Sequence, residues 1–203
     1  MARPPWRGRG VCRGLVEPAA LTEQRETVSP AGWNGPPLRV ALISDLHVGA
    51  PHCDAAMVRQ VVAMANAARP DLVLLLGDFG VDDVVGGEWV SPHEYAPLLA
   101  WLDAPLGTWA VLGNHDWGNG GAAIDDALER AGVRVLENES TRIDDPRGAF
   151  WLTGVGDWST GHARGSAAVG ALPADGLPVL AMTPATTQVV SGLLRATGPP
   201  AAA

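Results

Sequence analysis

The chain has 203 residues, of which 47% are hydrophobic and 18% are charged. This length and composition allow one well-buried core and argue against a disordered chain. The formal net charge of −8 disfavours a general nucleic-acid or anionic-membrane binder, because both rely on excess cationic charge. No segment has the apolar length of a signal peptide or a transmembrane helix, so we expect a cytoplasmic protein. No feature of the sequence indicates an oligomeric state.

Three apolar runs in the first half of the chain predict strands that are covered on both faces. They are "LRVALIS" (38–44), "DLVLLLG" (71–77) and "TWAVLG" (108–113). Between the first two runs, residues 53–70 carry a helical stripe of apolar side chains, with Asp54 as the cap and Pro70 just past the end. Residues 94–107 and 122–132 predict further helices, the second of which ends at Gly132.

The second half of the chain has a different character. Shorter β-like runs with fewer helices between them predict a second sheet. These runs are "VRVLEN", "TRIDD", "AFWLTGVGD" and "LPVLAM". The sequence therefore predicts an α/β protein with two sheets.

Polar residues follow each of the three long apolar runs. Ligands of open α/β sheets bind at the carboxyl ends of the strands, so we expect these residues to share one site. In extended geometry the first two would project from the same face and could bind one cation. The residues are Asp45 and His47 in "SDLHVG", Asp78 in "GDFG", and Asn114, His115 and Asp116 in "GNHD".

Each motif alone is weak, since a Gly-Asp pair is an ordinary turn and an Asn-His-Asp run can cap a helix. In this order, each after a β run, they resemble the signature of the calcineurin-like metallophosphoesterase family, which reads DxH, then GD, then GNH followed by Asp or Glu. The resemblance extends over about residues 14–183. It implies a four-layer α/β/β/α sandwich of two mixed sheets, with a two-metal site at one edge.

The resemblance also implies a set of metal ligands. Asp45 and His47 would hold the first divalent ion, Asp78 would bridge both ions, and Asn114 would bind the second through its amide oxygen. Carboxylates and imidazoles suit Mn, Fe or Zn, and the sequence does not choose among them. Two such ions clamp the phosphate oxygens and activate a water molecule that attacks phosphorus.

Two further residues would carry catalysis. By the same resemblance, His115 would stay off the metals and protonate the leaving alkoxide or stabilise the phosphoryl charge, and Asp116 would orient its ring. The implied substrate is a phosphate monoester or diester. Residues 80–95 form the loop that we expect near it.

The resemblance stops near Thr183. The family has a further His after the strand that reads "LPVLAM" here, and then a GHxH motif, whereas this chain continues "TPATTQVV". His162, in "GHARG", precedes that strand and is interpreted as a solvent-exposed loop residue. We therefore expect an N-terminal extension and first strand region at 1–37, a phosphoesterase domain at 38–183 with an incomplete second sheet, and an unmatched tail at 184–203.

Two functions from different classes stay open. The first is a metal-dependent phosphoesterase. The second is a catalytically impaired or dead relative that acts, if at all, as a binding or interaction protein, either as a truncated or frame-shifted product or by divergence. A Rossmann-type nucleotide binder is disfavoured, because no GxGxxG motif follows the first strand.

Overall fold

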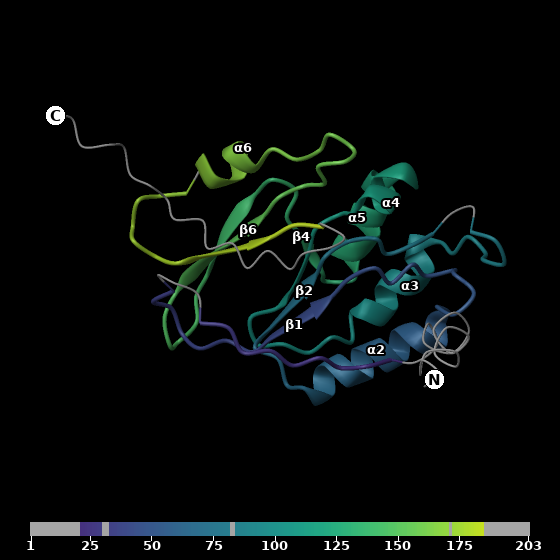
Figure 1. Cartoon of the computed structure of the whole chain (residues 1–203), viewed down its shortest axis with the longest axis horizontal. Helices are drawn as coiled ribbons and strands as arrows, with labels where there is room; N and C mark the ends of the chain where they lie inside the picture. Colours follow the sequence, from purple (N-terminus) through teal and green to yellow (C-terminus); the bar gives the residue numbers. More distant parts are fainter. Residues whose placement is uncertain (1–20, 30–32, 82–83, 171, 185–203) are drawn as a thin grey trace, which may run out of the picture.

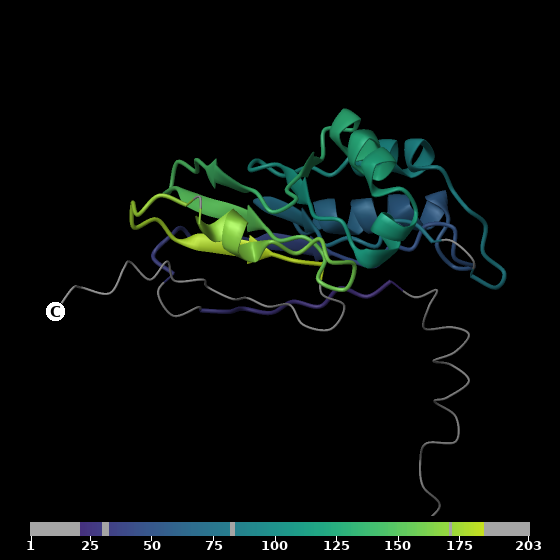
Figure 2. The same ribbon diagram turned by 90° about the horizontal axis from the view of Figure 1, so that it is seen from above.

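The computed structural model describes residues 21–29, 33–81, 84–170 and 172–184. The expected tail at 184–203 therefore lies outside the described residues apart from Pro184, and the expected extension at 1–37 is described only in part. Helices lie on one side of a first sheet, and a second sheet lies on the other side (Figure 1). Figure 2 shows the same grouping from above.

The first sheet has four described strands, all parallel, in the order β1-β2-β3-β4. Each of the three predicted buried runs forms one of them. Each strand is shorter than its run, and each ends before the polar residues that follow the run. The strands are β1 (Val40–Ile43), β2 (Leu72–Leu75), β3 (Thr108–Ala110) and β4 (Arg134–Val135).

Three helices cover the outer face of this sheet: α2 (Ala55–Ala67), α3 (Pro92–Leu99) and α5 (Gly121–Arg130). The predicted cap of α2 is confirmed, because the Asp54 carboxylate accepts the Met57 N–H at 2.8 Å. The predicted end of α5 is also confirmed, since Gly132 follows the helix with a φ of +82°.

The second sheet contains β5 (Ser140–Ile143), β6 (Phe150–Gly154) and β7 (Val179–Met182). β5 runs antiparallel to β6 and β7 runs parallel to it, so this sheet is mixed, whereas the first sheet is parallel over its described strands. Two short helices were not predicted: α4 (Asn114–Gly118) and α6 (Gly165–Gly170). They are too short to carry an apolar stripe that a sequence pattern would reveal.

Strand β2 explains why the molecule is layered. Val73 and Leu75 face the helices, and Leu72 and Leu74 face the second sheet, so one fully buried strand contributes to two cores. On the outer face of the second sheet, the Ser140 hydroxyl donates to a backbone carbonyl of α6 at 2.8 Å. The expected α/β/β/α order is confirmed, with α6 as the described part of the fourth layer.

One apolar side chain of β1 is not covered. Leu42 projects to the same side as Val40, toward the core between the sheets, yet it is 46% exposed. Within the described residues, the second sheet has three strands. An exposed leucine at this position fits the expected incomplete second sheet.

Candidate metal centre

The site is built from the loops that follow β1, β2 and β3. The first loop continues the parallel pairing beyond the strands: His47 N donates to the Asp78 carbonyl at 2.9 Å, and Val48 N donates to the Phe79 carbonyl at 2.8 Å. An isolated bridge between Val48 and Gly80 extends this pairing. The DxH and GD segments are therefore joined by backbone hydrogen bonds at one edge of the sheet.

The backbone at these motifs is strained. Asp45, His47 and Asp78 have φ values of 55°, 46° and 57°, in the left-handed region that residues other than glycine seldom adopt. The expectation that Asp45 and His47 share an extended strand face is therefore wrong, because β1 has already ended. The turn still brings the pair together, with His47 Nε2 at 3.7 Å from Asp45 Oδ1. Such strain concentrates at functional sites.

Two glycines allow the loops to approach closely. Gly77 has a φ of +87°, and a Cβ atom there would lie 2.4 Å from the Gly113 nitrogen. A Cβ atom on Gly113 would lie 2.2 Å from Asp78 Oδ1. Gly77 therefore lets the chain turn sharply before Asp78, and no larger residue fits at either position without a shift of the backbone.

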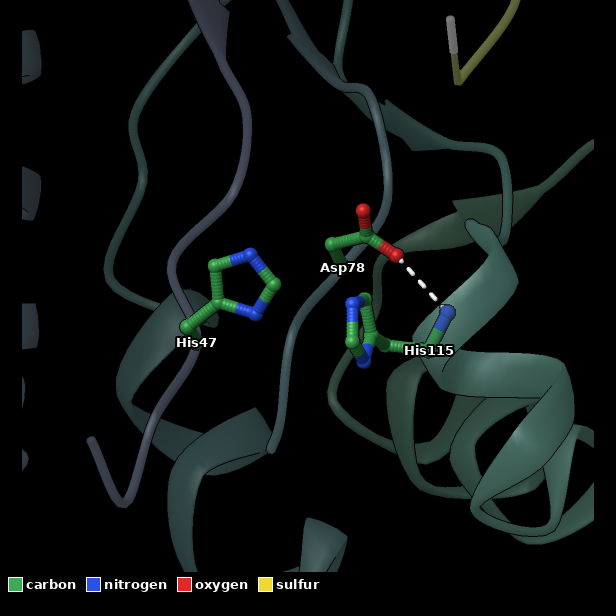
Figure 3. A group of neighbouring side chains, drawn as sticks. All are labelled: His47, Asp78 and His115. Carbon is green, nitrogen blue, oxygen red and sulfur yellow. Dashed lines mark hydrogen bonds between the residues drawn. The ribbon is translucent and has the colours of Figure 1, made fainter. Parts of the chain in front are cut away.

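His47, Asp78 and His115 form a cluster in which one potential ligand atom of each residue lies within 4.8 Å of the others (Figure 3). The two imidazole rings meet edge to face, with centroids 5.0 Å apart. His47 Nδ1 is buried and has no hydrogen-bond partner among the described residues. Two imidazoles and a carboxylate suit Mn, Fe or Zn, and a buried nitrogen without a partner fits a metal-ligand role.

The third loop leads directly into α4. Its first residue, Asn114, is half-buried, and the next residue, His115, is exposed. The His115 N–H donates to Asp78 Oδ1 at 3.0 Å, the contact drawn in Figure 3. Because this bond is made by the backbone, the His115 ring is free to face the cluster. The structure thus places His115 among the potential ligands, whereas the resemblance had kept it off the metals.

Asp116 makes contacts that differ from the expected ones. Its carboxylate is fully buried and accepts three backbone N–H groups at 2.8 Å, those of Asp78, Phe79 and Gly113. In the described chain, its hydrogen bonds go to this backbone and none goes to the His115 ring. Burial raises the pKa of Asp116 to about 6, against the lowering effect of the three donors.

A carboxylate that the sequence interpretation missed lies behind the third loop. Glu137 Oε1 accepts the Leu112 N–H at 2.7 Å, and its Oε2 is buried with no hydrogen-bond partner among the described residues. Burial, together with the nearby carboxylates of Asp125, Asp116 and Asp157, raises the pKa of Glu137 to about 7, against the lowering effect of the Leu112 N–H. The only signal in the sequence is an acidic residue directly after the apolar run "VRVL".

Two more loops pack beside these motifs. The His162 ring stacks on Trp117 of α4 with centroids 3.7 Å apart and planes 5° from parallel, so it is not a plain solvent-exposed residue as expected. On the other side, the Glu88 N–H donates to the Gly49 carbonyl at 2.8 Å. The loop expected near the substrate is therefore attached directly to the segment that carries His47.

Comparison with known proteins agrees with this geometry. The model of the calcineurin-like phosphoesterase family matches residues 38–168, which include all three motifs. The chain belongs to this family. Phosphodiesterase YaeI of Escherichia coli is 30% identical over 134 residues, which cover 64% of this chain and 48% of YaeI.

Two other relatives are similar at the same level. An uncharacterized metallophosphoesterase of Aquifex aeolicus is 33% identical over 111 residues, which cover 55% of this chain and 40% of the relative. UDP-2,3-diacylglucosamine pyrophosphatase LpxG of Chlamydia trachomatis is 34% identical over 97 residues, which cover 44% of this chain and 28% of LpxG. The matched regions span less than half the length of these relatives. None of the described helices has the length and apolar character needed to cross a membrane.

Proposed function

We propose that the chain is a metal-dependent phosphoesterase that hydrolyses phosphate diesters or monoesters at a two-metal site. The observation that carries this proposal is the cluster of His47, Asp78 and His115, which three separate loops bring within ligand distance of one another. Divalent ions at such a site stabilise the phosphoryl oxygens and activate water as the nucleophile. Manganese, iron and zinc all suit these donors.

The ligands divide by position. Asp78 lies between the other two loops and is 2% exposed, which supports the role of a residue that would bridge two ions. Asp45 and His47 approach one another on the β1 side, which suits the first ion. Asn114 begins α4 on the β3 side, which suits the second ion.

We assign His115 to proton transfer toward the leaving alkoxide. Its side chain is exposed while its backbone is held by Asp78, so the ring reaches solvent and substrate from a fixed position. The alternative role, that of a metal ligand, uses the same ring. The two roles differ in their consequences: loss of a ligand weakens metal binding, and loss of a proton donor slows esters with poor leaving groups most.

The substrate class follows from charge and from the relatives. The chain is acidic, so bound cations must supply the attraction for an anionic phosphate ester. The Escherichia coli relative is named a phosphodiesterase, which favours diesters over monoesters.

The test is hydrolysis of bis(4-nitrophenyl) phosphate with and without Mn²⁺, with 4-nitrophenyl phosphate as the monoester. We expect manganese-stimulated hydrolysis that Asp78→Asn abolishes. His115→Ala should keep Mn²⁺ binding, and it should slow hydrolysis of a dialkyl phosphate, whose leaving group is an alkoxide, more than hydrolysis of the bis-aryl compound, whose leaving group is 4-nitrophenolate. If His115→Ala instead loses metal in calorimetry, the ring is a ligand.

A matched control comes from an aspartate away from the site. Asp144 forms an exposed ion pair with Arg142. Asp144→Asn should not alter the rate. A wild-type chain with less than one bound metal per molecule, and with the same rate as Asp78→Asn, would refute the phosphoesterase and leave the catalytically dead relative.

A further inference from the structure

The turn that carries Asn114 and His115 has an unusual set of backbone partners. Three of its N–H groups donate to carboxylates: Leu112 to Glu137 at 2.7 Å, Gly113 to Asp116 at 2.8 Å, and His115 to Asp78 at 3.0 Å. Two of these carboxylates, Asp78 and Asp116, belong to the GD and GNHD motifs of the site. The third, Glu137, lies outside them and comes from the segment that follows β4.

The Leu112 N–H marks the point where the chain leaves the sheet. One residue earlier, the Val111 N–H still donates to the Leu75 carbonyl of β2 at 3.0 Å. Leu112 itself is fully buried, so its N–H requires an acceptor other than water. Glu137 supplies that acceptor, and the chain turns directly afterwards into Gly113 and α4.

The Glu137 carboxyl group is closely surrounded by backbone, with the Leu112 N–H at one oxygen and Gly156 beside the other. A Cβ atom on Gly156 would lie 2.7 Å from Glu137 Oε2. Gly156 N also donates to the amide oxygen of the neighbouring Asn138 at 3.2 Å, so the loop after β6 lies beside both side chains. A charged group in such a place is unfavourable unless it is paired, and here one oxygen is satisfied and the other is not.

We propose that Glu137 is a positioning residue for the metal centre, which holds the Leu112–Gly113 backbone so that Asn114 and His115 face Asp78. This inference rests on the proposed function. Outer partners that orient metal ligands typically contribute about 10-fold or more in metal affinity. A carbonyl oxygen at the Oε1 position is sufficient for this role, because the Leu112 N–H needs only an acceptor.

The test uses three variants of the full chain. Glu137→Gln keeps an acceptor oxygen, and Glu137→Met keeps the length of the side chain but has no comparable acceptor. Glu129→Met is the matched control, because Glu129 Oε1 also accepts a backbone N–H of the first sheet at 2.7 Å, that of Val135 on β4. Mn²⁺ affinity is measured by calorimetry, and the Leu112 amide is followed by NMR hydrogen exchange.

We expect Glu137→Met to weaken Mn²⁺ binding about 10-fold and to speed exchange of the Leu112 amide, with Glu137→Gln close to wild type in both. Glu129→Met should leave the Mn²⁺ affinity unchanged, although loss of the bond from the Val135 N–H can lower the melting temperature of this variant. The inference is overturned if wild type and Glu137→Met bind Mn²⁺ equally, or if Glu129→Met weakens binding as much as Glu137→Met. A wild-type chain that binds no Mn²⁺ overturns the proposed function and this inference together.

Discussion

Replacing Asp116 tests whether this carboxylate holds the site together through the backbone. Its Oδ2 accepts the N–H groups of Asp78 and Gly113, and its Oδ1 accepts that of Phe79. Asp116→Asn can keep the first two bonds with its amide oxygen and loses the third. Asp116→Ala loses all three, at a position that is fully buried.

The comparison of these two variants isolates the hydrogen bonds. The pKa of about 6 means that ionised Asp116 is less favourable by about 3 kcal/mol than an exposed aspartate. Both substitutions remove this charge, so its effect cancels between them. What differs is two buried N–H groups left without an acceptor, at about 1–3 kcal/mol each. We therefore expect Asp116→Ala to be about 2–6 kcal/mol less stable than Asp116→Asn.

Urea unfolding at pH 7, followed by circular dichroism in metal-free buffer, measures this difference directly. Asp116→Asn should lie near wild type, because the lost hydrogen bond and the removed charge offset one another. Equal unfolding free energies for the two variants, within about 0.5 kcal/mol, would refute the assigned role, since independent effects of this size are resolvable. If Asp116→Asn loses activity but keeps full stability and metal binding, the result would instead support the role that the resemblance implied, in which Asp116 orients the His115 ring.

Three further predictions concern the frame around the site. Gly77→Ala should lower the free energy of unfolding by about 1 kcal/mol or more, because Gly77 has a positive φ and an added Cβ would meet the Gly113 backbone. Gly118→Ala is the control: an added Cβ there meets open space, so the melting temperature should not fall. Asp54→Ala should cost about 1 kcal/mol in urea unfolding through the lost cap on the Met57 N–H, whereas Asp54→Ser should retain most of it. The folded pKa of Glu137, about 7, lies above its ordinary value of 4.5, so its contribution to stability is complete below about pH 4.5 and is lost as the pH rises through 7. The melting temperature of wild type should therefore fall relative to Glu137→Gln between pH 5 and pH 8, and a constant difference would contradict the raised pKa.

Much of the frame could be predicted from local patterns. The runs at 38–44, 71–77 and 108–113 are continuously apolar, which is typical of strands covered on both faces, and each became a strand of the first sheet. The cap at Asp54 and the glycine after α5 follow from backbone rules that act over one turn. The motifs at the strand ends predicted one shared site, because parallel strands bring their carboxyl ends to one edge.

The details of the site depend on contacts between distant segments. Asp45 and His47 are held in left-handed conformations by hydrogen bonds to the loop after β2, which no local pattern reveals. Glu137 is placed behind the third loop by the packing of the second sheet, and in the sequence it is only an acidic residue after an apolar run.

The sequence by itself predicted that the motif residues share one edge of a sheet, because apolar runs and the polar residues that follow them are local patterns. Only the tertiary structure decided which groups surround each carboxylate. Asp78 belongs to the candidate ligand cluster, as the resemblance implied, whereas Asp116 is closed in by three backbone N–H groups and not by the expected His115 ring. The physical reason is that a carboxylate takes its role from the donors around it, and those donors come from loops far apart in the chain.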